Sequence, residues 1–179
     1  LVPFAQPAEL ETGVGRIFER LAPELAAQFA DLRGRGLLDV ANRKGKRPGA
    51  FCYPLEESRI PFIFANAVGV DDDIRTLLHE MGHGFHAFAS RTQELVWYRD
   101  CPSEFAEVAS MSMELLGGRH LDVFYRDPEH AARSARENLE GIVSTFTWVA
   151  TIDAFQHWIY THPTHTQRER RDAWLGIVQ

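Results

Sequence analysis

Residues 71–90 read DDDIRTLLHEMGHGFHAFAS, and the HExxH pattern of His79, Glu80 and His83 lies in the middle of this stretch. Apolar residues recur along it at helical spacing, which predicts a helix from about Asp72 to Ser90. Those residues are Ile74, Leu77, Leu78, Met81, Phe85 and Phe88. On such a helix the two histidines share a face, with Cβ atoms roughly 5–6 Å apart. They can therefore hold one zinc ion, with Glu80 placed to take a proton from a water molecule on it.

The alternative for this helix is an amphipathic element whose histidines are buried and hydrogen-bonded without a metal. Gly82 and Gly84 each cost roughly 1 kcal/mol relative to alanine inside a helix. Their presence predicts that another backbone or a substrate approaches the helix closely at these positions.

The class of zinc site is narrowed by the residues that follow the two histidines. A metzincin would need Gly at position 86 and His at position 89, but the chain has His86 and Ala89, which excludes that class. A catalytic zinc site keeps three protein ligands and one open position. We therefore expect the third ligand to be a carboxylate from a second helix.

Residues 102–116, PSEFAEVASMSMELL, are predicted to form that second helix, with Pro102 in its first turn and two glycines after its end. Glu104, Glu107 and Glu114 fall on one face of it. Three carboxylates on one face would repel one another unless a cation were present. Spacing alone leaves the choice between Glu104 and Glu107 open, and Glu104 also suits the helix start as a simple N-terminal charge.

The segments HEMGHGFH and FAEVASMSMELL together resemble the thimet oligopeptidase and oligoendopeptidase F family of zinc peptidases. Residues 42–49 and 61–66 are similar to the segments that precede the zinc helix in bacterial members of that family. The resemblance covers residues 37–114 well and the rest of the chain weakly.

The resemblance implies one zinc ion per chain, with His79, His83 and Glu107 as its ligands and Glu80 as the catalytic base. It also implies that Glu114, two turns after Glu107, orients a ligand histidine.

The fold that the residues and the resemblance imply is mainly α, a helical zinc-peptidase core with a small antiparallel β element before the HExxH helix. Residues 50–55 and 60–66 are predicted strands. Apolar stripes predict two helices before residue 36 and a long helix over residues 127–161 with a buried stripe. Thr166 and Glu169 form a capping box that predicts a last helix.

Substrate contacts are predicted less specifically. The strand over residues 62–66 is a candidate edge for pairing with an extended peptide, which makes Phe64, Ala65 and Asn66 candidate substrate residues. An ordinary core strand is the alternative. His86 lies roughly 10 Å along the helix from His79, too far to join the same tetrahedral site easily, so it is interpreted as a structural or substrate-side residue.

The function that the resemblance implies is a zinc metalloendopeptidase for short peptides, with a water molecule on the zinc ion as the nucleophile and Glu80 as general base. Family members carry a large N-terminal helical region and a C-terminal His/Tyr motif. We expect residues 1–179 to be one domain, a fragment without these parts and poorly active alone. The alternatives are another zinc hydrolase such as a metallocarboxypeptidase, or a non-catalytic peptide-binding module.

Composition limits the other possibilities. The net charge of −6 argues against nucleic acid as the main partner. No apolar run reaches the length of a membrane span, and no signal-peptide pattern opens the sequence. Two cysteines, Cys52 and Cys101, make no disulfide framework, so we expect free thiols and a cytoplasmic location. The oligomeric state cannot be predicted from the sequence.

Overall fold

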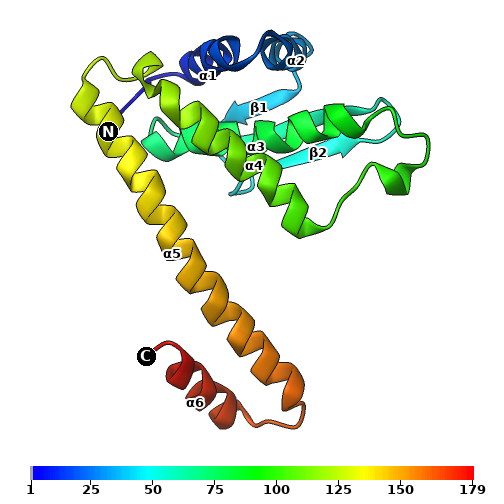
Figure 1. Ribbon diagram of the computed structural model, residues 1–179, viewed down its shortest axis with the longest axis vertical. Helices are drawn as coiled ribbons and strands as arrows, with labels where there is room; N and C mark the ends of the chain where they lie inside the picture. The colour runs from blue at the N-terminus through cyan, green and yellow to red at the C-terminus, as the bar shows by residue number, and fades with distance from the viewer. Residues whose placement is uncertain (1) are drawn as a thin grey trace. The chain divides into compact units, whose positions relative to one another are not determined.

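The computed structural model describes residues 2–179 and has the predicted mainly α fold with one small sheet (Figure 1). The elements in chain order are α1 (Pro7–Leu21), α2 (Pro23–Gly34), β1 (Leu38–Ala41), β2 (Phe51–Leu55), β3 (Ile60–Ala67), α3 (Asp71–Ser90), the 3-10 helix η1 (Val96–Tyr98), α4 (Ser103–Gly117), the 3-10 helix η2 (Gly118–Val123), α5 (Pro128–Thr161) and α6 (Gln167–Ile177). The chain forms two compact units, Leu1–Ser134 and Ala135–Gln179.

The sheet has the strand order β1-β3-β2. The predicted strands β2 and β3 pair in antiparallel fashion, with Cys52 opposite Ile63 and Pro54 opposite Pro61. Strand β1, which was not predicted, pairs with β3 in parallel. Its four residues are too few to show a hydrophobic period, so only the tertiary structure reveals it.

Strand β3 is therefore the central strand, and the premise that residues 62–66 form an exposed edge is wrong. Its backbone pairs with β1 on one side and with β2 on the other. Backbone pairing with a peptide is not available there. Among the described residues, the outer side of β2 is the sheet edge next to α3, and β2 and α3 are in contact.

The first unit has its core between α1, α2, α3 and the sheet. Phe18 makes edge-to-face contacts with Phe29 and Phe85, at centroid distances of 5.2 and 4.9 Å. The apolar stripe predicted for α3 is buried as expected, and its six side chains are at most 9% exposed. Burial of this stripe fixes α3 against the rest of the unit and leaves its histidine face for chemistry.

Helices α3 and α4 lie side by side (Figure 1). A Cβ atom at Gly82 would lie 2.5 Å from Cα of Ser110 and 2.6 Å from the carbonyl oxygen of Ala109. The prediction of a close backbone approach is thus confirmed at Gly82. At Gly84 a Cβ would meet only side chains, at 3.6 Å or more, so no backbone approaches closely there, and approach by a substrate stays a prediction.

The buried carboxylate of Asp71 anchors the N-terminal end of α3. It accepts hydrogen bonds from Tyr125, from Ser134 at 2.9 Å and from Arg75. Burial opposes ionisation of Asp71, but these three donors together hold its pKa below the usual range. The network therefore joins α3 to the first turns of α5 within the first unit.

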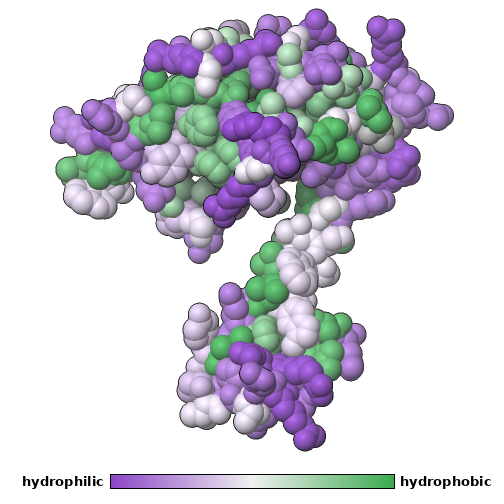
Figure 2. Space-filling model, turned by 180° about the vertical axis from the view of Figure 1, so that it is seen from behind, coloured by the Kyte–Doolittle hydropathy of each residue, from purple (hydrophilic) through white to green (hydrophobic). Residues whose placement is uncertain are grey.

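In the second unit, α6 begins with the predicted capping box of Thr166 and Glu169, and Trp174 packs edge to face on Phe155 at 5.0 Å. The prediction that α5 carries a long buried stripe is wrong. Leu139, Val143 and Phe146 are 57%, 66% and 74% exposed. Figure 2 shows such apolar (green) side chains at the surface along this helix. Among residues 2–179, no helix has the length and apolarity that a membrane span requires.

Candidate metal centre

Three side chains from α3 and α4 converge on one point. His79 and His83 are one turn apart on α3, and Glu107 faces them from α4. Oε2 of Glu107 lies 3.3 Å from Nε2 of His79 and 3.8 Å from Nε2 of His83. One ligand atom of each residue lies within 4.8 Å of the others, and this is the only such cluster among the described histidine, cysteine and acidic residues.

This donor set fits a zinc ion. Zinc bonds of about 2.0–2.2 Å in tetrahedral geometry place neighbouring ligand atoms about 3.4 Å apart. The two separations to Glu107 are close to that value. Two imidazoles and one carboxylate leave a fourth position open, as catalytic zinc sites do and structural sites do not.

Glu114 orients one of the two histidines. Its Oε1 lies 2.7 Å from Nδ1 of His79, so this nitrogen is a hydrogen-bond donor and Nε2 is left facing Glu107. The Glu114 hydrogen bond, opposed by burial, raises the pKa of His79. Burial instead lowers the pKa of His83, which favours the neutral imidazole that a metal requires.

Glu80 is buried beside the cluster, with 6% of its surface exposed. Burial is the main reason that its pKa rises to about 7, and Glu107 adds to the effect while His79 and the Cys52 backbone oppose it. A carboxylate with this pKa can both accept and release a proton near neutral pH. Burial of the Cys52 thiol, together with the nearby charge of Glu80, raises the pKa of that thiol to about 12.

Ser110 is a site residue that the sequence reasoning missed. Its side chain is fully buried, and its hydroxyl donates to the Glu107 backbone carbonyl at 3.1 Å and lies 2.8 Å from the Glu107 carboxylate. It therefore fixes the carboxylate that faces the two histidines. The signal in the sequence was present, because a serine three residues after a candidate ligand lies on the same helical face.

The remaining predicted residues lie outside the cluster. His86 contacts Cys101, with 3.7 Å between its Nδ1 and the sulfur, and both cysteines are free as expected. Glu104 is exposed at the start of α4 and is not brought to the histidines. Spacing left Glu104 and Glu107 open, and the structure places only Glu107 beside His79 and His83.

The three candidate substrate residues of β3 have partners within the sheet region. Phe64 stacks on Phe51 at 4.7 Å, and the buried Lys46 amine donates to the Ala65 carbonyl. The Asn66 amide donates to the carbonyls of Arg47 and Gly49. These contacts hold the 42–50 loop against the sheet, and a substrate role for these side chains stays a prediction.

Comparison with known proteins adds independent evidence. The sequence pattern of Peptidase family M3 matches residues 25–179. Oligopeptidase PepF of Bacillus subtilis (strain 168) is 31% identical over 145 residues, which are 79% of this chain and 21% of that protein. The chromosomal oligoendopeptidase F of Lactococcus lactis subsp. cremoris is 38% identical over 77 residues, 43% of this chain and 13% of its own length.

Solved structures agree with this match. A chain assigned as an oligoendopeptidase F from Bacillus anthracis str. Ames superposes with a TM-score of 0.91 and 30% identity, over 98% of this chain and 32% of that one. PZ peptidase A, solved with an inhibitor, gives a TM-score of 0.89 and 31% identity over 96% of this chain and 30% of its own. The chain thus spans about a fifth or less of these curated relatives and a third of the solved chains. Because the family pattern matches most of this chain, the chain belongs to Peptidase family M3.

Proposed function

We propose that this chain carries the zinc-binding and general-base groups of a metalloendopeptidase that hydrolyses short peptides. The observation that carries the proposal is the meeting of His79, His83 and Glu107 around one point, with the buried Glu80 beside them. The names of the relatives, oligopeptidase and oligoendopeptidase, support short peptides as the substrate class.

Each residue has a defined task in this proposal. His79, His83 and Glu107 would hold the ion, and a zinc ion there supplies a Lewis acid and a water molecule of lowered pKa. Glu114 and Ser110 hold His79 and Glu107 in place. Glu80 accepts the proton of the attacking water and passes it to the leaving amine, for which a pKa near 7 is well suited.

The peptide would bind along the outer side of β2. This edge follows from the strand order, and it begins beside Glu80, which interacts with the Cys52 backbone. An extended peptide added to a sheet edge is held by main-chain hydrogen bonds, which suits an enzyme that accepts many sequences.

The proposal is tested with an internally quenched peptide of about eight residues whose C-terminus is amidated. The zinc-loaded chain is expected to cut it only slowly, at an internal bond, and Glu80→Gln is expected to retain zinc and to abolish the cleavage. Cleavage only of a peptide with a free C-terminal carboxylate would instead indicate a carboxypeptidase. Peptide binding by a chain that takes up no zinc would indicate a binding module and would overturn the proposal.

A further inference from the structure

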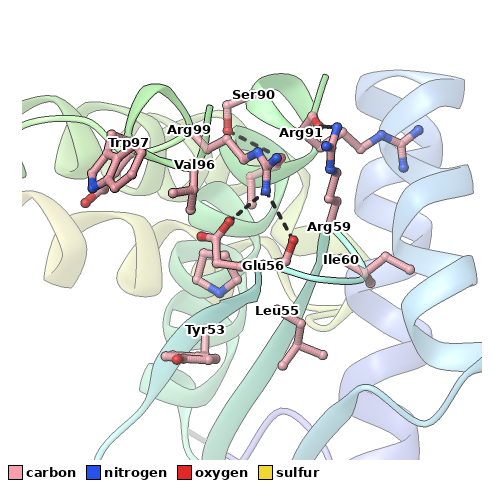
Figure 3. Close-up of a pocket in the computed structure, with 13 residues that line it drawn as sticks. Tyr53, Leu55, Glu56, Arg59, Ile60, Ser90, Arg91, Val96, Trp97 and Arg99 are labelled. Carbon is pink, nitrogen blue, oxygen red and sulfur yellow. Dashed lines mark hydrogen bonds and ion pairs between the residues drawn. The ribbon is translucent and has the colours of Figure 1, made fainter. Parts of the chain in front are cut away.

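A cavity of about 330 Å³ lies beyond the metal cluster, at the far end of β2. Its walls come from β2, from the second half of α3 and from the segment around η1, and they include Pro54, Ala87, Ser90, Val96 and Trp97. Figure 3 shows Val96 and Trp97 on one side, Arg59 and Arg91 on the other, and the Glu56–Arg99 pair between them. The volume is at the lower end of the roughly 300–1,000 Å³ range of small-ligand sites, so it suits a single large side chain.

The direction in which β2 presents its backbone can be derived from two prolines. Pro54 lies opposite Pro61, and neither has an N–H, so this pair cannot be hydrogen-bonded. Hydrogen-bonded and non-bonded pairs alternate along antiparallel strands, so the pair of Cys52 and Ile63, two positions away, is also non-bonded. The backbone N–H and C=O of Cys52 therefore point away from β3. In agreement, the N–H of its partner Ile63 donates to the carbonyl of Leu37, on the side of β3 that faces away from β2. The carbonyls of Cys52 and Pro54 are therefore the acceptors at the free edge.

The face on which a bound side chain would lie follows from the same register. A Cβ at Gly84 of α3 would lie 3.7 Å from the side chains of Ile63 and Pro61, so these residues point toward α3. Cys52 and Pro54, directly opposite them, share that face. A peptide residue paired with Pro54 would also point toward α3, where Ala87 and Ser90 line the cavity.

Two of the arginines around the cavity have partners within the protein. The Arg99 side chain, 11% exposed, forms an ion pair with Glu56 at 3.0 Å and donates to the carbonyls of Gln93, Glu94 and Glu56. Arg59 donates to the carbonyl of Arg91. Pro54, Ala87, Val96 and Trp97 form an apolar part of the wall, and Trp97 is 79% exposed.

We infer that this cavity is a specificity pocket for one apolar, preferably aromatic, side chain of an extended peptide bound along β2. The inference rests on the proposed function. In an antiparallel peptide, the residue beside Pro54 precedes the residue beside Cys52 by two positions, since the chains run in opposite directions. Cys52 adjoins Glu80, so the pocket selects a residue on the amino-terminal side of the scissile bond.

The test measures binding, so that slow turnover does not obscure it. Fluorescein-labelled hexapeptides carry Phe, Ala or Asp at one position at a time, and their Kd for zinc-loaded Glu80→Gln chain is measured by fluorescence anisotropy. One position is expected to prefer Phe over Asp by about tenfold or more, as burial of an apolar side chain predicts. Equal affinities at every position would overturn the inference.

Ala87→Leu narrows the pocket and keeps good helix propensity. In the Glu80→Gln background it is expected to weaken binding of the Phe peptide about tenfold at that position only, and to leave the Ala peptide within about twofold. Ala30→Leu, at an exposed alanine of α2, is the matched control and should change neither. An unchanged Phe preference in Ala87→Leu would contradict the pocket.

Zinc content measured on the same samples separates the two proposals. A chain that holds one zinc and binds peptides without selectivity contradicts the pocket and leaves the peptidase proposal intact. A chain that takes up no zinc contradicts the peptidase proposal, whatever the peptide affinities.

Discussion

Helices α3 and α5 carry apolar stripes of similar spacing, but the two stripes end in opposite environments. On α3, Ile74, Leu77 and Leu78 are fully buried between the sheet and the other helices. On α5, Leu139 and Phe146 are 57% and 74% exposed. Periodicity therefore predicts that a helix forms and which face is apolar, because both are local properties. Whether that face is buried depends on partners that are distant in sequence.

The largest expected effect concerns the core side of this comparison. Leu77→Ala should lower the free energy of unfolding by about 3 kcal/mol, since it removes a fully buried side chain and leaves a cavity. Urea unfolding followed by circular dichroism measures it. A loss below about 1 kcal/mol would mean that the α3 stripe is not packed as described.

The second prediction concerns the buried charge that α3 carries and α5 lacks. The pKa of Glu80 is raised from 4.5 to about 7, so the folded chain holds this proton more tightly than the unfolded chain. The resulting contribution to stability is full below pH 4.5 and is lost as the pH rises through 7. The free energy of unfolding of metal-free Glu80→Gln should therefore exceed that of the metal-free parent by about 3 kcal/mol at pH 8 and match it near pH 4.

Urea unfolding at the two pH values measures this difference. Glu140→Gln, on the exposed face of α5, is the control and should stay within about 0.5 kcal/mol of the parent at both pH values. A parent chain as stable as Glu80→Gln at pH 8 would show that the Glu80 carboxylate is not buried in the way described.

The third prediction compares two helical serines, Ser110 on α4 and Ser144 on α5. Ser110 holds the Glu107 carboxylate, whereas Ser144 on α5 only donates to the Glu140 carbonyl in its own helix. Ser110→Ala should weaken zinc binding about tenfold, as loss of a group that orients a ligand does. Ser144→Ala should leave the zinc Kd unchanged. Competition with a chelating dye gives the zinc Kd of both variants. Equal Kd values would show that Ser110 does not hold Glu107 for zinc binding.

The smallest expected effect is at the exposed stripe. Leu139→Ala should change the free energy of unfolding by less than about 0.5 kcal/mol, because the side chain is already mostly in water. The same substitution at Leu77 and at Leu139 thus compares the two helices directly. A loss at Leu139 as large as that at Leu77 would show that the α5 stripe is buried in solution.

Much of the fold was predictable because its signals are local. The bounds of α3 and α4, the hairpin of β2 and β3 and the capping box of α6 all follow from short-range patterns. Strand β1 was missed because four residues carry no period. The order β1-β3-β2, which makes β3 central, depends on pairings between distant segments and could not be read from the sequence.

The candidate site also has residues that local sequence predicts and one that only helix packing identifies. His79, Glu80 and His83 come from one helical turn, so the sequence alone brings them together. Spacing could not choose between Glu104 and Glu107, because both suit the same helix face. Only the packing of α4 on α3 at Gly82, a contact between two helices, determines which carboxylate meets the histidines. Ser110 contacts Glu107 within its own helix, so the spacing of three residues was a local signal that was missed.

Zinc content by elemental analysis, on protein purified without added metal or a metal-binding tag, tests the central claim most directly. The parent chain is expected to hold about one zinc ion, Glu107→Ala none, and Glu104→Ala as much as the parent. Zinc retained in Glu107→Ala, or lost in Glu104→Ala, would contradict the assignment of His79, His83 and Glu107 as the metal site.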